Sequence, residues 1–128
     1  MARKKLATKK ILIVEDEQFL SEMYREVFLN AGFIVATAPT GKSALKSAVE
    51  MRPDLILLDI LMPDGNGIYF LQEQAKNKNI ADIPVVAFSN LDDPKLKEEA
   101  LLLGTKEYLL KTEYTPRELV AKINAYLI

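Results

Sequence analysis

Five short, predominantly apolar runs recur at nearly even intervals, and their spacing restricts the fold more than any other feature of the sequence. They are ILIV (11–14), FIVATA (33–38), LILL (55–58), IPVVAF (83–88) and EYLL (107–110), and successive runs start 22, 22, 28 and 24 residues apart. That interval accommodates one strand and one helix that returns the chain to the start of the next strand. Because the runs are continuous rather than alternating, they indicate parallel strands covered on both faces.

The segments between these runs show the periodicity of amphipathic helices. Their apolar residues form five stripes: Phe19, Leu20, Met23, Tyr24, Val27 and Phe28; Leu45, Ala48 and Val49; Ile68, Leu71 and Ala75; Leu96, Ala100 and Leu103; Leu119, Ile123 and Leu127. Asp93-Pro94 predicts a helix start, TPRE (115–118) predicts a capping box, and Gly32 and Gly104 predict helix ends. The sequence therefore predicts an α/β, doubly wound (βα)5 flavodoxin-like fold, with a five-stranded parallel sheet and helices on both faces.

Composition limits the chain to one domain and excludes several kinds of chemistry. A chain of 128 residues, 49% of them hydrophobic, can bury a substantial core. The absence of histidine excludes a His general base, a Ser-His-Asp triad and His-bound metals. The absence of cysteine excludes disulfides, thiolate nucleophiles and Cys-type zinc sites. Any chemistry must therefore rely on carboxylates, hydroxyls, lysines and, where one binds, a hard cation.

Charge is distributed unevenly along the chain. Residues 1–10 hold five basic residues and no acidic one, so the remainder carries 12 basic and 18 acidic residues. We expect residues 1–9 to form a flexible basic tail and residues 10–128 to form the domain, whose acidic balance argues against direct nucleic-acid binding. No apolar run approaches the roughly 18 residues that span a bilayer, and the first run is too short for a secretory signal. We therefore expect a cytoplasmic protein without membrane insertion.

Polar residues follow four of the five predicted strands. Glu15 and Asp16 come after the first, Asp59 after the third, Ser89 after the fourth and Lys111 after the fifth. Taken singly, each residue has an ordinary interpretation as a cap or a solvated side chain. The carboxyl ends of parallel strands form one ligand-binding edge, however, and clustered carboxylates repel one another unless a cation lies between them. The pattern favours a partly hydrated Mg²⁺ site.

Asp59 is the residue whose position most needs a chemical explanation. It ends the apolar stretch PDLILLD (53–59), where an unpaired charge is costly. A carboxylate beside a divalent cation can attack a phosphoryl group and become an aspartyl phosphate. In this interpretation the cation and Lys111 neutralise the phosphoryl oxygens, and Ser89 hydrogen-bonds one of them.

These residues lie in motifs that resemble the receiver domain of two-component response regulators. The motifs are ILIVEDE, LLDILMPDGNG, VVAFSN and GTKEYLLK, and the resemblance extends from about Lys10 to Ile128. It implies that Asp59 is the phosphorylation site and Lys111 the phosphoryl-binding lysine. Ser89 and Tyr108 are the implied switch pair. The resemblance further implies metal ligands, which are Glu15, Asp16, Asp59 and the backbone carbonyl of Leu61.

The resemblance also implies a function. A single-domain response regulator of this kind accepts a phosphoryl group from a histidine kinase or a phosphotransfer protein, with Mg²⁺ as cofactor. It is a signalling phosphoacceptor that assists its own phosphorylation and dephosphorylation, not an enzyme in the usual sense. Phosphorylation changes the face formed by the fourth helix, fifth strand and fifth helix, which then signals to an unknown downstream protein or forms a dimer.

The chain departs from the family pattern at several positions. Thr112 replaces the proline that normally follows the lysine, so we expect a trans peptide and a differently placed loop. Asn90 replaces a small residue after the switch hydroxyl. Leu61 and Leu91, each two residues beyond an active-site residue, cannot orient an attacking water, which predicts slow hydrolysis of the aspartyl phosphate. The run LLL (101–103) predicts at least one exposed leucine on the signalling face.

Three other functions are compatible with the predicted fold. A phosphorylation-independent, receiver-like binding module would explain the altered segment after Lys111. A small phosphatase with an aspartate nucleophile would be expected to carry a second aspartate where this chain has Leu61. A flavodoxin-like electron carrier would be expected to have a Ser-, Thr- or Gly-rich loop after the first strand, where this chain has EDE (15–17).

Overall fold

The computed structural model describes residues 8–62 and 67–127, and within them strands and helices alternate strictly. The strands are β1 (Lys10–Val14), β2 (Ile34–Ala38), β3 (Leu55–Asp59), β4 (Val85–Ser89) and β5 (Glu107–Leu110). The helices are α1 (Gln18–Asn30), α2 (Gly41–Met51), α3 (Gly67–Lys76), α4 (Pro94–Leu102) and α5 (Pro116–Leu127), with a 3₁₀ turn at Lys111–Glu113. The predicted order of elements is confirmed.

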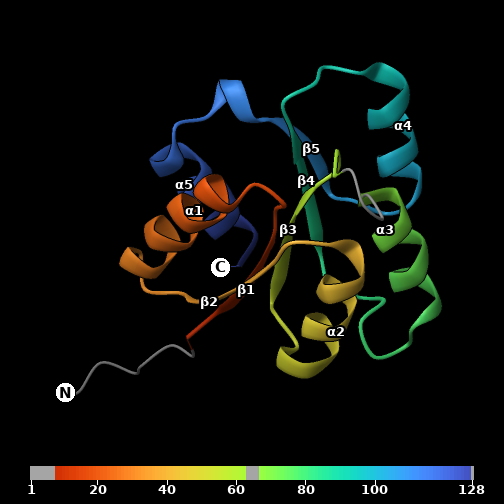
Figure 1. Cartoon of the computed structure of the whole chain (residues 1–128), viewed down its shortest axis with the longest axis horizontal. Helices are drawn as coiled ribbons and strands as arrows, with labels where there is room; N and C mark the ends of the chain where they lie inside the picture. Colours follow the sequence, from red (N-terminus) through yellow and green to blue (C-terminus); the bar gives the residue numbers. More distant parts are fainter. Residues whose placement is uncertain (1–7, 63–66, 128) are drawn as a thin grey trace.

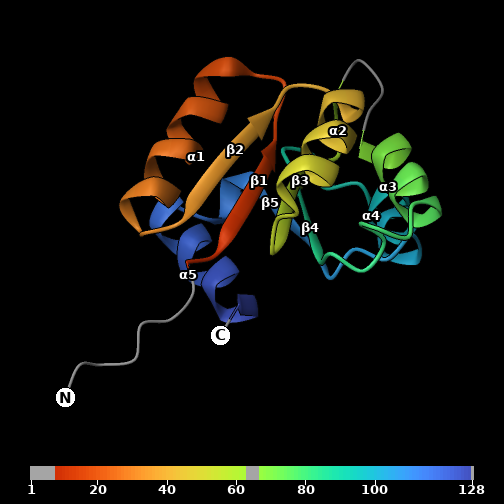
Figure 2. The ribbon, with the colours of Figure 1, turned by 90° about the horizontal axis from the view of Figure 1, so that it is seen from below.

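The five strands form one parallel sheet in the order β2-β1-β3-β4-β5. Helices α1 and α5 cover one face, and α2, α3 and α4 cover the other, as Figures 1 and 2 show from two directions. Because both faces are covered, β1, β3 and β4 are buried along almost their whole length. The doubly wound fold predicted from the spacing of the runs is confirmed.

Helix ends lie where the sequence signals placed them. Asp93 caps α4 by accepting hydrogen bonds from the N–H groups of Lys95 and Leu96. Thr115 and Glu118 bond each other reciprocally at the start of α5, at 2.8 and 3.1 Å, which is the predicted capping box. Gly104 after α4 has φ +107°, a conformation that residues with a Cβ rarely adopt.

The stripe predicted for α1 is wrong at Phe19, which is 75% exposed. The buried residues of this helix are Ser21, Tyr24 and Phe28. Phe19 precedes Phe28 by nine residues, or about two and a half turns, and therefore lies on the opposite side of the helix. The predictions are also wrong at Val49 of α2, which is 42% exposed, and at Ala75 of α3, which is exposed. In α3 Gln74 is buried instead of Ala75, and its amide donates to the carbonyls of Ile80 and Ile83 and so compensates its burial.

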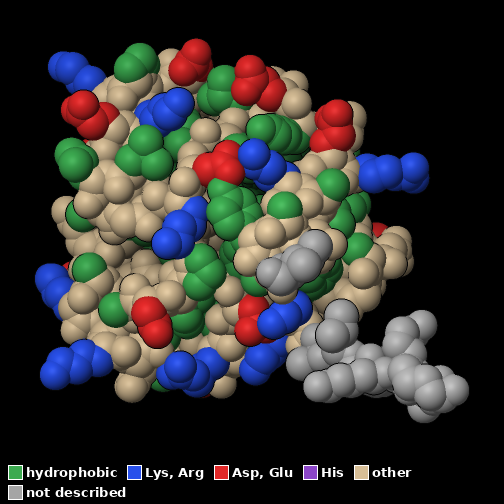
Figure 3. Space-filling model, turned by 180° about the vertical axis from the view of Figure 1, so that it is seen from behind, with side chains coloured by type: hydrophobic (Ala, Val, Ile, Leu, Met, Phe, Trp, Pro, Cys, Tyr) green, Lys and Arg blue, Asp and Glu red, His purple; other side chains and the backbone are tan. Residues whose placement is uncertain are grey.

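None of the helices within the described residues combines the length and the apolarity that crossing a membrane requires. On the face seen in Figure 3, basic, acidic and hydrophobic side chains are interspersed, and neither sign of charge covers the surface.

Candidate functional site

The strand register brings the polar residues that follow the strands to one edge of the sheet. Asp59 pairs with Phe88, and Phe88 pairs with Leu109. Side chains alternate between the two faces of a strand, so Lys111, two residues beyond Leu109, continues the face to which Asp59 and Phe88 belong. This is the face that packs against α1 and α5. Ser89, the neighbour of Phe88, belongs to the opposite face.

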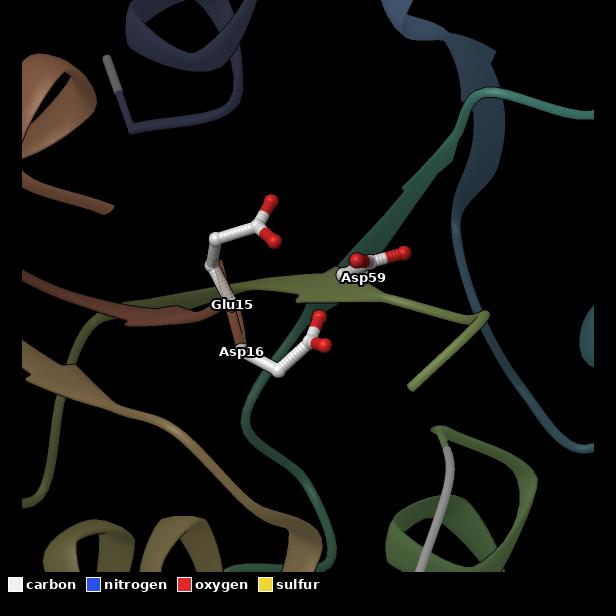
Figure 4. A group of neighbouring side chains, drawn as sticks. All are labelled: Glu15, Asp16 and Asp59. Carbon is white, nitrogen blue, oxygen red and sulfur yellow. The ribbon is translucent and has the colours of Figure 1, made fainter. Parts of the chain in front are cut away.

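Three carboxylates converge at the carboxyl ends of β1 and β3. Glu15, Asp16 and Asp59 each offer one oxygen atom, and these atoms all lie within 4.8 Å of one another (Figure 4). Glu15 and Asp59 are only 2% and 4% exposed, whereas Asp16 is exposed. A pocket of about 340 Å³ opens beside Glu15 and Asp16. The cluster combines negative charge with an exposed member, Asp16, through which a cation can approach.

Lys111 supplies the positive charge nearest to these carboxylates. Its Nζ lies 2.7 Å from Glu15 Oε1 and 3.3 Å from Asp59 Oδ2, and its side chain is only 6% exposed. The remaining carboxylate oxygens accept backbone hydrogen bonds. The N–H of Glu17 donates to Glu15 Oε2, and the N–H of Leu61 donates to Asp59 Oδ1 at 3.0 Å. Every oxygen of these two carboxylates therefore has one donor.

One ammonium does not compensate two buried carboxylates. Burial raises the pKa of Glu15 to about 6, although the hydrogen bond from Lys111 opposes the change. Burial also raises the pKa of Asp59, and the charge of Lys111 offsets only part of this. Burial alone would lower the pKa of Lys111, but its hydrogen bond to Glu15 and the charge of Asp59 raise it. The cluster is therefore short of positive charge, which a proton or a cation can supply.

We expect Glu15 to make the metal-free fold less stable as the pH rises from about 4.5 to about 6. A carboxyl group whose folded-state pKa exceeds its unfolded value stabilises the fold at pH values below the unfolded pKa. That contribution is lost as the pH rises through the folded pKa. The shift from 4.5 to about 6 corresponds to about 2 kcal/mol.

Chemical denaturation of the wild type and of Glu15→Gln in a chelator, over a pH range that spans both pKa values, would measure this contribution. The free energy of unfolding of the wild type should fall relative to that of the variant as the pH rises. Saturating Mg²⁺ should reduce the fall. A difference between the two proteins that does not change with pH would contradict the prediction.

The chain leaving Asp59 is held by a close backbone contact. The N–H of Gly67 donates to the carbonyl of Ile60 at 3.1 Å. A Cβ at position 67 would lie 2.7 Å from Ile60 Cα, so glycine is required for α3 to approach this closely. The side chain of Leu61 is 43% exposed, and its backbone N–H donates to Asp59. Residues 63–66, which include part of the DGNG motif, lie outside the described residues.

Ser89 and Tyr108 are connected through the backbone of Leu91. The N–H of Leu91 donates to Ser89 Oγ at 3.1 Å, and the Tyr108 hydroxyl donates to the carbonyl oxygen of Leu91 at 3.0 Å. Ser89 is fully buried, and Tyr108 is 9% exposed. Burial raises the pKa of Tyr108, while a hydrogen bond with the Ser89 side chain opposes this. The two residues therefore form one network on the face of the sheet opposite Lys111.

Thr112 lies in a 3₁₀ turn directly after β5. The described residues contain no cis peptide bond, in agreement with the expected trans peptide, and residues 111–113 form a single 3₁₀ turn. Thr112 is exposed. Asn90, the second unusual residue, is also exposed.

Phe88 contacts the site but was not anticipated as part of it. The Nζ of Lys111 lies 4.8 Å from the centroid of the Phe88 ring. In the sequence Phe88 is one of several apolar residues in the run before Ser89, so only its neighbours in space distinguish it from the rest of the core.

Comparison with known proteins decides the family. The family model described as "Response regulator receiver domain" matches residues 11–124. The chain belongs to the receiver domain family. This receiver domain is 36% identical over 119 residues to the phosphate regulon transcriptional regulatory protein PhoB of Escherichia coli, covering 93% of the chain and 52% of PhoB. It is 34% identical to the alkaline phosphatase synthesis transcriptional regulatory protein PhoP of Bacillus subtilis, of which it covers 48%. The receiver domain thus spans about half the length of these relatives.

Solved structures agree with this assignment. The chemotaxis protein CheY4 of Vibrio cholerae superimposes with a TM-score of 0.86 at 27% identity, covering 93% of this receiver domain and 98% of CheY4. The receiver domain of a signal transduction histidine kinase from Syntrophus aciditrophicus gives a TM-score of 0.82 at 26% identity, with 94% and 90% covered. Receiver domains are signalling phosphoacceptors that bind Mg²⁺ at an acidic pocket, and the cluster of Glu15, Asp16 and Asp59 is compatible with that ion.

Proposed function

We propose that this receiver domain accepts a phosphoryl group on Asp59 from a phosphohistidine of a histidine kinase or a phosphotransfer protein. The surroundings of Asp59 support this proposal. It is a nearly buried carboxylate 3.3 Å from an ammonium, and it shares a cluster with two further carboxylates at the ligand-binding edge of the sheet. Such a group can react with phosphorus when its charge and that of the phosphoryl oxygens are compensated.

The transfer is a single displacement at phosphorus. An oxygen of Asp59 forms the new P–O bond while the P–N bond to the donor imidazole breaks, and the bonding electron pair remains on the imidazole nitrogen. Lys111 gives up its contact with Asp59 and donates to a phosphoryl oxygen. The N–H of Leu61, which donates to Asp59 Oδ1 at 3.0 Å, holds the carboxylate in a fixed orientation.

The donor set of the cluster fits Mg²⁺, a hard cation that prefers oxygen ligands. Glu15, Asp16, Asp59 and the carbonyl oxygen of Leu61 would hold it. When bound, the ion supplies the positive charge that neutralises the transferred group. Glu15 and Lys111 hydrogen-bond each other at 2.7 Å, so binding of the cation and the position of the lysine are coupled.

Phosphorylation then changes the network on the opposite face of the sheet. Ser89 turns its hydroxyl toward the phosphoryl group and no longer accepts from the N–H of Leu91, whose carbonyl oxygen accepts from Tyr108. This change alters the surface of α4, β5 and α5. Leu101 and Leu102 are 41% and 81% exposed on α4, which supports this surface as the docking surface for a downstream protein or a second copy of the chain. The domain itself makes no direct contact with nucleic acid in this proposal.

The test is incubation with phosphoramidate, a small donor that replaces the phosphohistidine, followed by intact mass measurement. We expect a mass gain of one phosphoryl group that requires Mg²⁺ and disappears when the ion is chelated. The absence of any gain, under conditions that phosphorylate another receiver domain, would favour a binding module that works without phosphorylation.

We expect the aspartyl phosphate to hydrolyse slowly, and Leu91→Asn to accelerate its hydrolysis by about tenfold. Leu91 is 48% exposed beside Ser89, and an amide at this position can orient a water molecule that the leucine side chain cannot hold. The decay of the phosphorylated mass after removal of phosphoramidate measures the rate. Leu29→Asn, the same change at a leucine that is 38% exposed on α1, away from the signalling face, should leave the rate unchanged. An equal rate of hydrolysis in wild type and Leu91→Asn would contradict the predicted effect of Leu91.

A further inference from the structure

The position of the Lys111 ammonium depends on its side-chain contacts, because the local backbone does not fix it. Its four-carbon side chain is flexible, and the Thr112 that follows belongs to one short 3₁₀ turn whose preceding residue offers no side-chain cap. Two of its contacts, with Glu15 and Asp59, involve the carboxylates that are proposed to bind the cation and the phosphoryl group. In the proposed function the contact with Asp59 is given up, and the contact with Glu15 is coupled to binding of the cation. A third contact, with the ring of Phe88, involves no reacting atom.

The ring of Phe88 is itself rigidly placed. Phe88 is 1% exposed in β4, and Tyr24 of α1 packs edge-on against it, with ring centroids 5.3 Å apart and an interplanar angle of 71°. Backbone pairing fixes its position between Asp59 of β3 and Leu109 of β5. The ring is therefore held by the sheet on both sides and by a helix above, so its face is a stationary surface for the ammonium.

We propose that Phe88 is a positioning residue for phosphoryl transfer, because its aromatic face keeps the Lys111 ammonium at the site while the carboxylate contacts of Lys111 change. This inference rests on the proposed function, in which Lys111 donates to the phosphoryl group. The attraction between a cation and a ring face is strongest where both are removed from water, and here the lysine side chain is only 6% exposed. The attraction acts on the charge of the whole ammonium and needs no directed N–H bond, so the three N–H groups of Lys111 remain available for oxygen acceptors.

The first experiment compares Phe88→Leu with Phe28→Leu. Phe28 is a matched control, because it is fully buried and has its own edge-on partner, Phe33, at 5.6 Å. We expect Phe88→Leu to lower the maximal rate of phosphoryl uptake at saturating Mg²⁺ and phosphoramidate by about tenfold. Phe28→Leu should change that rate by less than about twofold, with a comparable loss of stability in chemical denaturation. Equal rates for the two variants would overturn the inference.

A second experiment distinguishes the electrostatic effect of the Phe88 ring from the effect of its size. Phenylalanines that carry one, two and three ring fluorines, introduced at position 88, keep the ring in place but progressively weaken its attraction for a cation. We expect the rate to fall stepwise along the series, while the same series at position 28 stays flat. A flat series at position 88, in a protein that is still phosphorylated, would overturn the inference and leave the proposed function intact. A wild-type protein that takes up no phosphoryl group would overturn both.

Discussion

Asp59→Asn is expected to abolish phosphoryl uptake from phosphoramidate, with a fall in rate of at least about a thousandfold. The amide lacks the carboxylate oxygen that would attack phosphorus, but it preserves the size of the side chain. Its Oδ1 can still accept the hydrogen bond from the N–H of Leu61. Because burial raises the pKa of Asp59, the charged form is disfavoured in the fold, and loss of this charge should not destabilise the protein.

Intact mass measurement in Mg²⁺ checks this result, and Asp82→Asn is the matched control. Asp82 is exposed in the segment that precedes β4, and the same chemical change there should leave uptake normal. Retention of full labelling in Asp59→Asn would show that another residue receives the phosphoryl group. Fragmentation of the labelled protein would then locate it.

Lys111→Met is expected to have two large effects. Without Mg²⁺ at a pH above the pKa of Glu15, it should lower the free energy of unfolding by about 3 kcal/mol. Two carboxylates that are at most 4% exposed would lose the one ammonium that contacts them among the described residues. It should also slow phosphoryl uptake by about a hundredfold, because no ammonium then stabilises the phosphoryl oxygens.

The stability loss should depend on pH and on the cation. Without the ammonium, the pKa values of Glu15 and Asp59 rise further, so both carboxyl groups take up protons and become neutral as the pH falls. Chemical denaturation should therefore show the largest loss at high pH in a chelator, and smaller losses at low pH or with Mg²⁺. A loss of equal size under all these conditions would mean that Lys111 acts through the packing of its methylene groups.

A surface ion pair of the same type provides the control for Lys111→Met. Lys122 lies 3.2 Å from Glu107, and their side chains are 37% and 33% exposed. Lys122→Met should cost at most about 1 kcal/mol, because water screens the pair in the folded state and solvates both charges. The difference between the two lysine variants then isolates the effect of burial.

The sequence by itself determined the architecture and the location of the site. Continuous apolar runs at intervals of 22 to 28 residues are compatible with few arrangements other than parallel strands joined by helices. Parallel strands end at a common edge, so the residues after each run had to converge there. For this reason the convergence of Glu15, Asp16, Asp59 and Lys111 could be predicted without knowledge of any distance.

Tertiary structure decided which of these residues touch. Lys111 pairs with Glu15 and Asp59 rather than with Asp16, because alternation along the strands places Lys111 and Asp59 on one face of the sheet. The sequence also did not predict that Leu91 links Ser89 to Tyr108. Nor did it predict that the ring of Phe88 lies against the ammonium of Lys111. Periodicity indicates which face of an element is buried, but contacts between strands depend on register, which forms only when the whole sheet assembles.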